Sequence, residues 1–199
     1  MKDMIFIMQG GPATGKTTVG QRLARSLKIP YFSKDGVKEP IFDDVGCPVA
    51  FETDEPLSGR KMDNAAISIL FYLIEMQLQV GCACIIDSTF EARHTPILKA
   101  LKSRYPFTPI QILCRAEASE LARRYQRRTK TGERHPGHLD QWLSDSFDAD
   151  ELERIFQQPL DIGGHVLKVD TTDFKEEDLQ KLLQSIESLP DYDRGRRYL

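Results

Sequence analysis

Met4-Ile5-Phe6-Ile7-Met8 opens a stretch that continues as Gln9-Gly10-Gly11-Pro12-Ala13-Thr14-Gly15-Lys16-Thr17-Thr18 and then places Val19, Leu23 and Leu27 at helical spacing. Within this stretch, Gly10, Gly15, Lys16 and Thr17 complete the pattern G-x-x-x-x-G-K-[ST]. The pattern requires a buried strand before it and a helix after it, and the apolar run and the helical spacing supply both. We therefore predict a phosphate-binding loop. A glycine-rich turn without a ligand is the alternative, but it leaves the lysine and the hydroxyl unexplained.

The residue types of this loop suit a polyphosphate. Backbone N–H groups must approach the phosphates closely, and glycine permits this because it has no Cβ. Lys16 adds a point charge for the β- and γ-phosphates, Thr17 offers a hydroxyl to Mg²⁺, and the helix that begins at Lys16 directs its N-terminal dipole at the anion. ATP and Mg²⁺ are the expected cofactors. The predicted nucleotide-binding loop residues are Gly10, Gly11, Pro12, Ala13, Thr14, Gly15, Lys16, Thr17 and Thr18.

Composition indicates one soluble domain. The chain has 199 residues, of which 40% are hydrophobic and 29% charged, and no apolar run approaches the ~20 residues of a membrane span. The first residues lack the pattern of a secretory leader and the four cysteines form no C-x-x-C pair, so we expect a cytoplasmic protein with reduced thiols. We predict a single domain over 1–190, with a lid at about 117–148, and a polar tail over 191–199.

Strands and helices alternate along the rest of the chain. We predict further strands at 29–32, 82–87, 109–114 and 164–170, and helices after Ser33, over 61–80, over 93–104, over 120–128 and from Leu179 to Ile186. The helix over 61–80 is apolar on most faces, so we expect it to be largely buried. The polar stretch over 43–60 is predicted to be a surface loop near the substrate.

Asp87 ends the predicted strand over 82–87. An apolar strand that delivers a carboxylate beside a phosphate loop is the Walker-B arrangement, so Asp87 and Thr17 are the candidate Mg²⁺ ligands. The alternative for Asp87 is a turn residue at a strand end. Ser88 follows Asp87 where a hydrolytic motor usually has glutamate, which disfavours a motor.

Asp35 follows the second predicted strand, and ligands of open α/β sheets bind at this end of the strands. Phosphoryl transfer to an alcohol needs a group that accepts the hydroxyl proton, and Asp35 is the candidate base. An N-cap role for Asp35 is the alternative. Lys38, one helical turn later, is a candidate contact for an anionic group on the acceptor.

Arginines in the predicted helix over 120–128 stand at i and i+4, so one pair shares a face. Arg124 and Arg128 are expected to act with Lys16 on the charge of the transferring group and to exclude water, and Arg124 is also expected to bind ATP. A solvated basic face is the alternative.

His135 and His138 also stand close together in the sequence, and such a pair can bind a metal ion. The intervening Pro136 and Gly137 instead favour a lid loop.

Three segments together resemble a known family: residues 33–39, the strand end at 86–89 and the helix over 121–128. They are similar to the P-loop kinases grouped with 5′-hydroxyl polynucleotide kinases, zeta toxins and chloramphenicol phosphotransferase, over about residues 4–185. The resemblance implies that Asp35 is the general base, that Lys38 contacts the substrate, and that Arg124 and Arg128 are lid arginines on ATP.

We predict a three-layer α/β P-loop kinase fold with a helical lid and a five-stranded parallel sheet of order 2-3-1-4-5. The expected function is an ATP-dependent kinase that phosphorylates a hydroxyl of a small molecule. The alternatives are a polynucleotide 5′-hydroxyl kinase, a nucleotide-binding regulatory module and a zeta-type toxin. ATP and a small-molecule acceptor are the expected partners; nucleic acid is not favoured, because the net charge is −3, and no membrane partner is expected.

Overall fold

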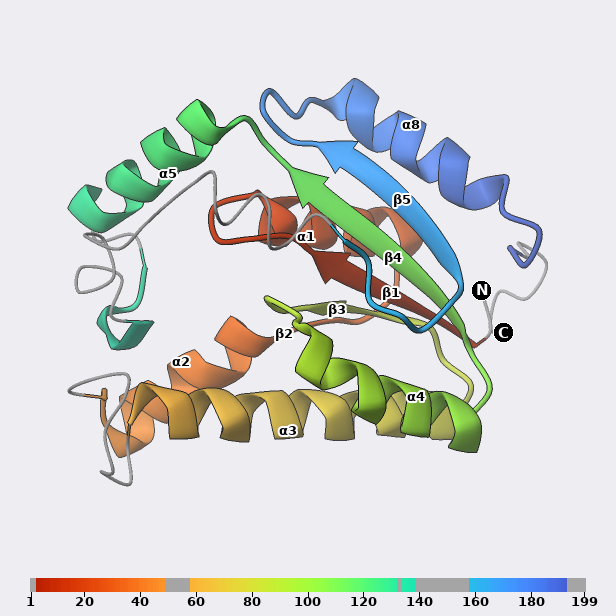
Figure 1. The fold of residues 1–199 in the computed structure, drawn as a ribbon, viewed down its shortest axis with the longest axis horizontal. Coiled ribbons are helices and arrows are strands. Elements are labelled where there is room, and N and C mark those ends of the chain that lie inside the picture. Colours follow the sequence, from red (N-terminus) through yellow and green to blue (C-terminus); the bar gives the residue numbers. More distant parts are fainter. Residues whose placement is uncertain (1–2, 49–57, 132–133, 139–157, 193–199) are drawn as a thin grey trace.

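A five-stranded parallel sheet forms the middle layer of the protein (Figure 1). The computed structural model describes residues 3–48, 58–131, 134–138 and 158–192. The strands are β1 (Met4–Gln9), β2 (Tyr31–Ser33), β3 (Cys84–Asp87), β4 (Thr108–Arg115) and β5 (His165–Asp170). Their order is β2-β3-β1-β4-β5, and all four pairings are parallel. The predicted sheet is therefore confirmed.

β1 is the central strand and is buried on both faces. Met4, Phe6 and Met8 point into one hydrophobic cluster, and Ile5 and Ile7 point into the other. Side chains of a strand alternate between the faces, so an unbroken apolar run is what a strand covered by helices on both sides requires.

Helices form the two outer layers (Figure 1). α1 (Lys16–Leu27) and α8 (Glu176–Glu187) cover the face of Met4, Phe6 and Met8. α3 (Gly59–Gln79) and α4 (Thr95–Arg104), which follows the 3-10 turn η1 (Ala92–His94), cover the opposite face. α2 (Lys34–Val45) packs against α3, and α5 (Ala118–Thr131) and the 3-10 turn η2 (Pro136–His138) follow β4 along the chain.

α3 differs from the expectation that it is largely buried. One stripe of it packs on the sheet, through residues such as Leu70, Ile74 and Leu78, whereas Ile69 is 41% exposed and Tyr72 is 59% exposed. The prediction of burial was wrong because a helix in an outer layer meets the sheet along a single stripe, and apolar residues beyond that stripe remain at the surface.

Two predicted segments lie partly outside the described residues. The stretch over 43–60 contributes its first residues to α2 and its last to α3, and residues 49–57 lie outside. Of the predicted lid, α5 and residues 134–138 are described, whereas 132–133 and 139–148 are not. No helix in the described ranges has the length and apolar character needed to cross a membrane.

Candidate active site

The phosphate loop joins β1 to α1 and curls back on itself. Gly10 has φ 138°, and a Cβ there would lie 2.5 Å from the carbonyl oxygen of Cys114, so only glycine fits. Gly15, with φ 77°, is the N-cap of α1 and has no side chain to occupy the first helical N–H groups. The Thr14 hydroxyl donates to the carbonyl oxygen of Gly11 at 2.8 Å. The N–H groups and the dipole of α1 are therefore directed at any anion held by the loop.

Lys16 folds back over this loop, and its Nζ donates to the carbonyl oxygen of Gly11 at 2.9 Å. Burial lowers the pKa of Lys16, while the negative charges of Asp87 and, more weakly, Asp35 oppose the shift. A bound polyphosphate adds further negative charge, which favours the protonated ammonium group.

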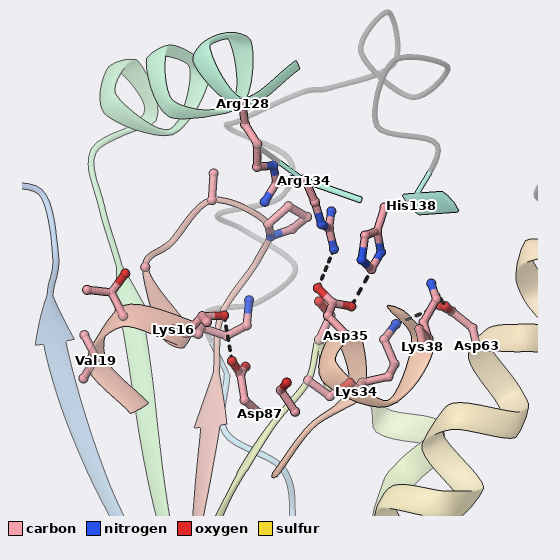
Figure 2. Close-up of a pocket in the computed structure, with 18 of the residues that line it drawn as sticks. Lys16, Val19, Lys34, Asp35, Lys38, Asp63, Asp87, Arg128, Arg134 and His138 are labelled. Atoms are coloured by element: carbon pink, nitrogen blue, oxygen red, sulfur yellow. Dashed lines mark hydrogen bonds and ion pairs between the residues drawn. The ribbon is translucent and has the colours of Figure 1, made fainter. Parts of the chain in front are cut away.

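Asp87, the last residue of β3, receives hydrogen bonds from two other segments. Thr17 Oγ1 donates to Asp87 Oδ2 at 2.8 Å, and the Tyr31 hydroxyl donates to the same oxygen at 2.5 Å. The strand register brings Asp87 close to Thr17 and Tyr31, because Asp87 lies opposite Met8 of β1 and Ser33 of β2. Figure 2 shows the Asp87 carboxylate beside the loop that carries Lys16.

The oxygens of Thr17 and Asp87 fit a magnesium ion. Hydroxyl and carboxylate oxygens are hard ligands, and Mg²⁺ is usually held by one or two carboxylates, with water and substrate phosphates completing its shell. Across the described ranges, no group of three or more His, Cys, Asp or Glu side chains is placed to hold a metal ion. A site that relies on nucleotide phosphates needs no such group.

Tyr31 contacts Asp87, although no motif in the sequence marks it. Its ring packs against Gly20 of α1, where a Cβ would lie 2.8 Å from the ring atom Cε2. Burial and the adjacent Asp87 carboxylate raise the pKa of Tyr31, so the phenol remains a hydrogen-bond donor. The sequence feature that could have indicated this contact is the place of Tyr31 on β2, the strand predicted to lie beside β3.

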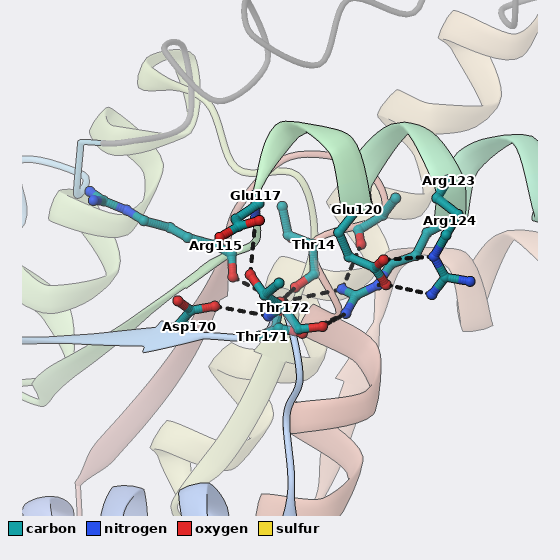
Figure 3. Close-up of polar contacts among 10 residues, drawn as sticks. Thr14, Arg115, Glu117, Glu120, Arg123, Arg124, Asp170, Thr171 and Thr172 are labelled. Carbon is teal, nitrogen blue, oxygen red and sulfur yellow. Dashed lines mark hydrogen bonds and ion pairs between the residues drawn. The ribbon is translucent and has the colours of Figure 1, made fainter.

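Arg124 ties α5 to the phosphate loop and to the end of β5 (Figure 3). Its guanidinium group donates to the carbonyl oxygen of Ala13 at 3.3 Å, to that of Thr172 at 3.1 Å and to that of Thr171. Its Nε donates to Glu120 at 2.7 Å. The predicted lid arginine therefore lies in direct contact with the phosphate loop.

Thr171, the first residue after β5, contacts the phosphate loop and the end of β4 at the same place. Its hydroxyl lies 2.7 Å from the carbonyl oxygen of Thr14 and 2.8 Å from that of Arg115, and it can donate to either. The side chain is buried, with Thr171 only 1% exposed. The contact holds the end of β5 against the phosphate loop.

Arg128 lines the same cavity as Arg124, one turn further along α5. Its guanidinium carbon lies 5.3 Å from the ring centroid of Tyr125, within the range of a cation–π contact. Arg123 instead is exposed on the outer side of α5 and binds Glu120 at 2.7 Å. Of the two arginine pairs, the structure places Arg124 and Arg128 toward the cavity.

Asp35 lies in the first turn of α2, but Ser33 caps the helix by accepting a hydrogen bond from the backbone N–H of Gly36 at 2.9 Å. The Asp35 carboxylate instead binds Arg134, and the Nδ1 atom of His138 lies 3.9 Å from its Oδ1 (Figure 2). Burial alone would raise the pKa of Asp35. The surrounding cations, of which Arg134 is the strongest, outweigh burial and hold this pKa below its ordinary value.

Lys38 lines the cavity and shares a carboxylate of α3 with Lys34. Its side chain is 7% exposed, and its Nζ binds Asp63 Oδ1, while Lys34 binds Asp63 Oδ2 at 2.8 Å. Burial alone would raise the pKa of Asp63, but the two lysines lower it. No motif in the sequence marks Asp63, which comes from a helix distant in sequence. The acceptor contact predicted for Lys38 stays a prediction.

Two histidines, His138 of η2 and His135 just before it, attach this segment to α2. His138 Nε2 lies 3.0 Å from Glu39 Oε1, and His135 Nε2 lies 3.1 Å from Asp43 Oδ1. The His135 ring also stacks on Phe42, with ring centroids 5.2 Å apart. These contacts hold residues 134–138 over the same helix that carries Asp35.

One cavity of about 650 Å³ connects these groups. Its lining includes the predicted phosphate- and metal-binding residues and the residues around the candidate base. The first group is Lys16, Thr17, Asp87, Arg124 and Arg128, and the second is Lys34, Asp35, Lys38, Asp63, Arg93, His94, Arg134 and His138.

Comparisons with known proteins agree with this geometry. A solved structure of a provisionally assigned kinase from Chloroflexus aurantiacus J-10-fl is 35% identical, with a TM-score of 0.77, and the match covers 94% of this chain and 97% of that chain. A sugar kinase from Janibacter sp. HTCC2649 is 15% identical with a TM-score of 0.59, covering 96% of this chain and 97% of that one, and shares the fold. A shikimate kinase from Bacteroides thetaiotaomicron shares it at 16% identity and a TM-score of 0.50, over 94% of this chain and 99% of that one.

No curated protein matches the chain. The family model described as AAA domain matches residues 5–147, which is most of the chain. The predicted resemblance to P-loop kinases is confirmed, and the chain belongs to this AAA domain family, with the fold of a P-loop kinase.

Proposed function

We propose that this protein is an ATP-dependent kinase that transfers the γ-phosphate to a hydroxyl group of a small-molecule acceptor. The observation that carries the proposal is the position of Asp35, which lines the same cavity as Lys16 and Asp87. A carboxylate at that place can accept the proton of a hydroxyl group that enters the cavity. The cavity volume, about 650 Å³, lies within the range of small-molecule sites.

The proposed reaction assigns a task to each side chain. Lys16 and the loop N–H groups bind the β- and γ-phosphates, and Mg²⁺ at Thr17 and Asp87 would supply charge neutralisation when bound. The acceptor oxygen forms a bond to the γ-phosphorus, the bond from that phosphorus to the bridging oxygen breaks, and ADP leaves. Asp35 takes the hydroxyl proton, while Arg124 and Arg128 stabilise the charge of the transferring group.

Two observations favour a small molecule over the 5′ end of a polynucleotide. The net charge of the chain is −3, and Lys38, which the family resemblance assigns to a substrate phosphate, is already paired with Asp63. A phosphate of the acceptor would have to compete with Asp63 for this lysine.

ATP consumption with Mg²⁺ tests the proposal against a panel of sugar acids, sugars, polyols, nucleosides, nucleotide sugars, aminoglycosides and 5′-hydroxyl oligonucleotides. Stimulation by a small hydroxyl compound supports the proposal, and Lys16→Ala should abolish it. Stimulation by oligonucleotides alone would establish the polynucleotide alternative. Binding of ATP without stimulation by any class would favour the regulatory module.

A further inference from the structure

His94 lines the cavity, and its hydrogen bond to the backbone determines where its ring proton lies. Its Nδ1 accepts from the backbone N–H of Glu91 at 2.9 Å. Burial, together with the nearby charge of Arg93, lowers the pKa of His94, so the ring is neutral at neutral pH. A neutral imidazole carries one proton, and Nε2 must hold it because Nδ1 is an acceptor. His94 Nε2 is therefore a hydrogen-bond donor.

Packing fixes the orientation of this donor. The centroid of the His94 ring lies 6.2 Å from that of Phe71 and 5.8 Å from that of Phe90, and the residue is only 6% exposed. Lys34, which lines the same cavity, is close enough for its charge to lower the pKa of His94 as well. Within the described parts of the chain, Nε2 has no hydrogen-bond partner. An oxygen atom that enters the cavity can accept from it.

Ser88 supplies a second polar group on the same side of the sheet. It comes two positions after Ile86 of β3, which packs in one cluster with Phe71 and Phe90. Side chains alternate along a strand, so Ser88 continues the face of the sheet on which His94 packs. Ser88 lines the cavity and is 5% exposed, and its Oγ is buried without a hydrogen-bond partner among the described residues. A small apolar side chain would fill this place without the cost of an unpaired hydroxyl.

A hydroxyl group of a ligand satisfies both side chains at once. Its oxygen accepts from His94 Nε2, and its proton can be donated to Ser88 Oγ, which has two lone pairs. Neither side chain is charged, so the ligand group needs no charge either. This hydroxyl is not the one that is phosphorylated, because that one must lie at Asp35.

We propose that His94 and Ser88 hold a second hydroxyl group of the acceptor and so position the reacting hydroxyl at Asp35. The inference rests on the proposed function and narrows its acceptor class to small polyhydroxylated compounds. Alcohols with a single hydroxyl group are poor acceptors, because nothing in them pairs with His94 and Ser88 while the reacting hydroxyl lies at Asp35. The two residues bind and orient the acceptor, and the proton transfer stays with Asp35.

Binding measurements on matched pairs of ligands test the site without turnover. The protein, with isotope-labelled histidine, is loaded with Mg²⁺ and a non-hydrolysable ATP analogue. It is titrated with glycerol against propanol, inositol against cyclohexanol, and ribose against tetrahydrofurfuryl alcohol. NMR should show the ring proton of His94 on Nε2, and at least one polyol should shift that resonance. By calorimetry this polyol should bind about tenfold or more tightly than its monohydric partner.

Two variants separate binding from a structural role. His94→Asn retains an oxygen that can accept from Glu91 but lacks the Nε2 donor, so it should fold and lose the preference for the polyol. Ser88→Ala removes an unpaired hydroxyl, so it should melt at or above the temperature of the original protein and still bind the polyol less tightly. The affinity for the ATP analogue should be unchanged in both. A merely structural role predicts a lower Tm and an unchanged preference.

Matched controls come from parts of the chain that do not line the cavity. Ser103→Ala removes an exposed hydroxyl of α4 that donates to the carbonyl oxygen of Lys99, and His165→Asn changes a histidine of the edge strand β5. Both variants should keep the preference for the polyol.

The outcomes separate this inference from the proposed function. Equal binding of every polyol and its partner, a His94 proton on Nδ1, or a preference that survives in His94→Asn or Ser88→Ala would overturn it. If His94→Asn does not fold, Ser88→Ala tests the site by itself. The kinase proposal fails independently, if no acceptor of the panel stimulates ATP consumption while the polyol still binds at His94.

Discussion

Asp35 projects from α2 into the cavity while Ser33 caps the helix, so the two tasks are separable by substitution. Asp35→Asn should leave the affinity for ATP nearly intact and reduce phosphoryl transfer by a factor on the order of 10² or more, because an amide accepts no proton at neutral pH. Single-turnover rates and ATP titrations measure the two quantities. Asp43→Asn, further along α2 and bound to His135, is the matched control and should retain transfer. If Asp35→Asn loses ATP binding to the same extent, the residue is structural.

Tyr31 also has a role that a single substitution can test, because its hydroxyl donates to the same oxygen of Asp87 as Thr17 does. Tyr31→Phe removes one of these donors and leaves the Asp87 carboxylate less firmly oriented. We expect the Mg²⁺ concentration for half-maximal activity to rise about tenfold. Binding of Mn²⁺ followed by electron paramagnetic resonance gives a second readout that does not depend on turnover. Tyr105→Phe, which loses a hydrogen bond to Glu75 away from the site, should change neither. An unchanged metal requirement in Tyr31→Phe would remove its positioning role.

The sequence predicts some of these side-chain contacts and not others, because only some of them are set by a local motif or by the order of the strands. Lys16 and Thr17 are placed by a local motif, and Asp87 by the end of a strand whose neighbour is the strand before that motif. The contacts of Tyr31 and Asp63 depend on which way a side chain points and on how α2 and α3 pack, and no local pattern determines either. Arg134 reaches Asp35 across a separation of 99 positions, and its place in the segment after α5 gives no sign of that partner.

η2 and α2 are held together by contacts that include a buried histidine, His138. Burial and Arg134 keep the pKa of His138 below the ordinary histidine value, although Asp35 and Glu39 oppose the shift. In the unfolded chain His138 takes up its proton at about pH 6.5, before the folded protein does. Protonation therefore favours the unfolded chain, and Asp35, whose pKa is also lowered, adds an effect of the same sign at lower pH.

We therefore expect the free energy of unfolding to decrease as the pH falls below about 6.5, until the pKa of the folded His138 is reached. Urea titrations at about pH 7.5 and 5.5 measure the difference. His138→Gln should reduce it, whereas His165→Gln, on the edge strand β5, should not. A pH dependence that is identical in His138→Gln would show that this histidine does not carry the effect.

The spacing of apolar residues predicts the positions of the helices better than it predicts which of their residues are buried. The apolar residues over 61–80 predict α3 nearly to its ends, but they fill more than the stripe that contacts the sheet. Which apolar residues become the buried stripe is decided by the position of α3 in an outer layer. That position is a property of the assembled sheet and not of the helix sequence.

Nucleotide binding should stabilise the folded protein as a whole, because the phosphate loop contacts α5 and the end of β5 through Arg124 and Thr171. With Mg²⁺ and an ATP analogue at 100 times its Kd, the stabilisation is about 2.7 kcal/mol. For a chain of this length that corresponds to a rise in Tm of about 5–10 °C. Differential scanning fluorimetry should show the rise in Lys181→Ala, a surface variant of α8, and not in Lys16→Ala. A full rise in Lys16→Ala would place the nucleotide elsewhere.

The central place of β1 also has a consequence for how the chain is made. Of the five strands, β1 comes first in the sequence, and the strands on its two sides, Cys84–Asp87 and Thr108–Arg115, come much later. At ~5–20 residues per second, about 5–20 s of translation separate β1 from β4. Until β3 is made, the apolar run of Met4 to Met8 has neither neighbour, and until β4 is made it has at most one. The segment that later becomes the most protected strand is therefore, on the ribosome, the one most in need of a chaperone.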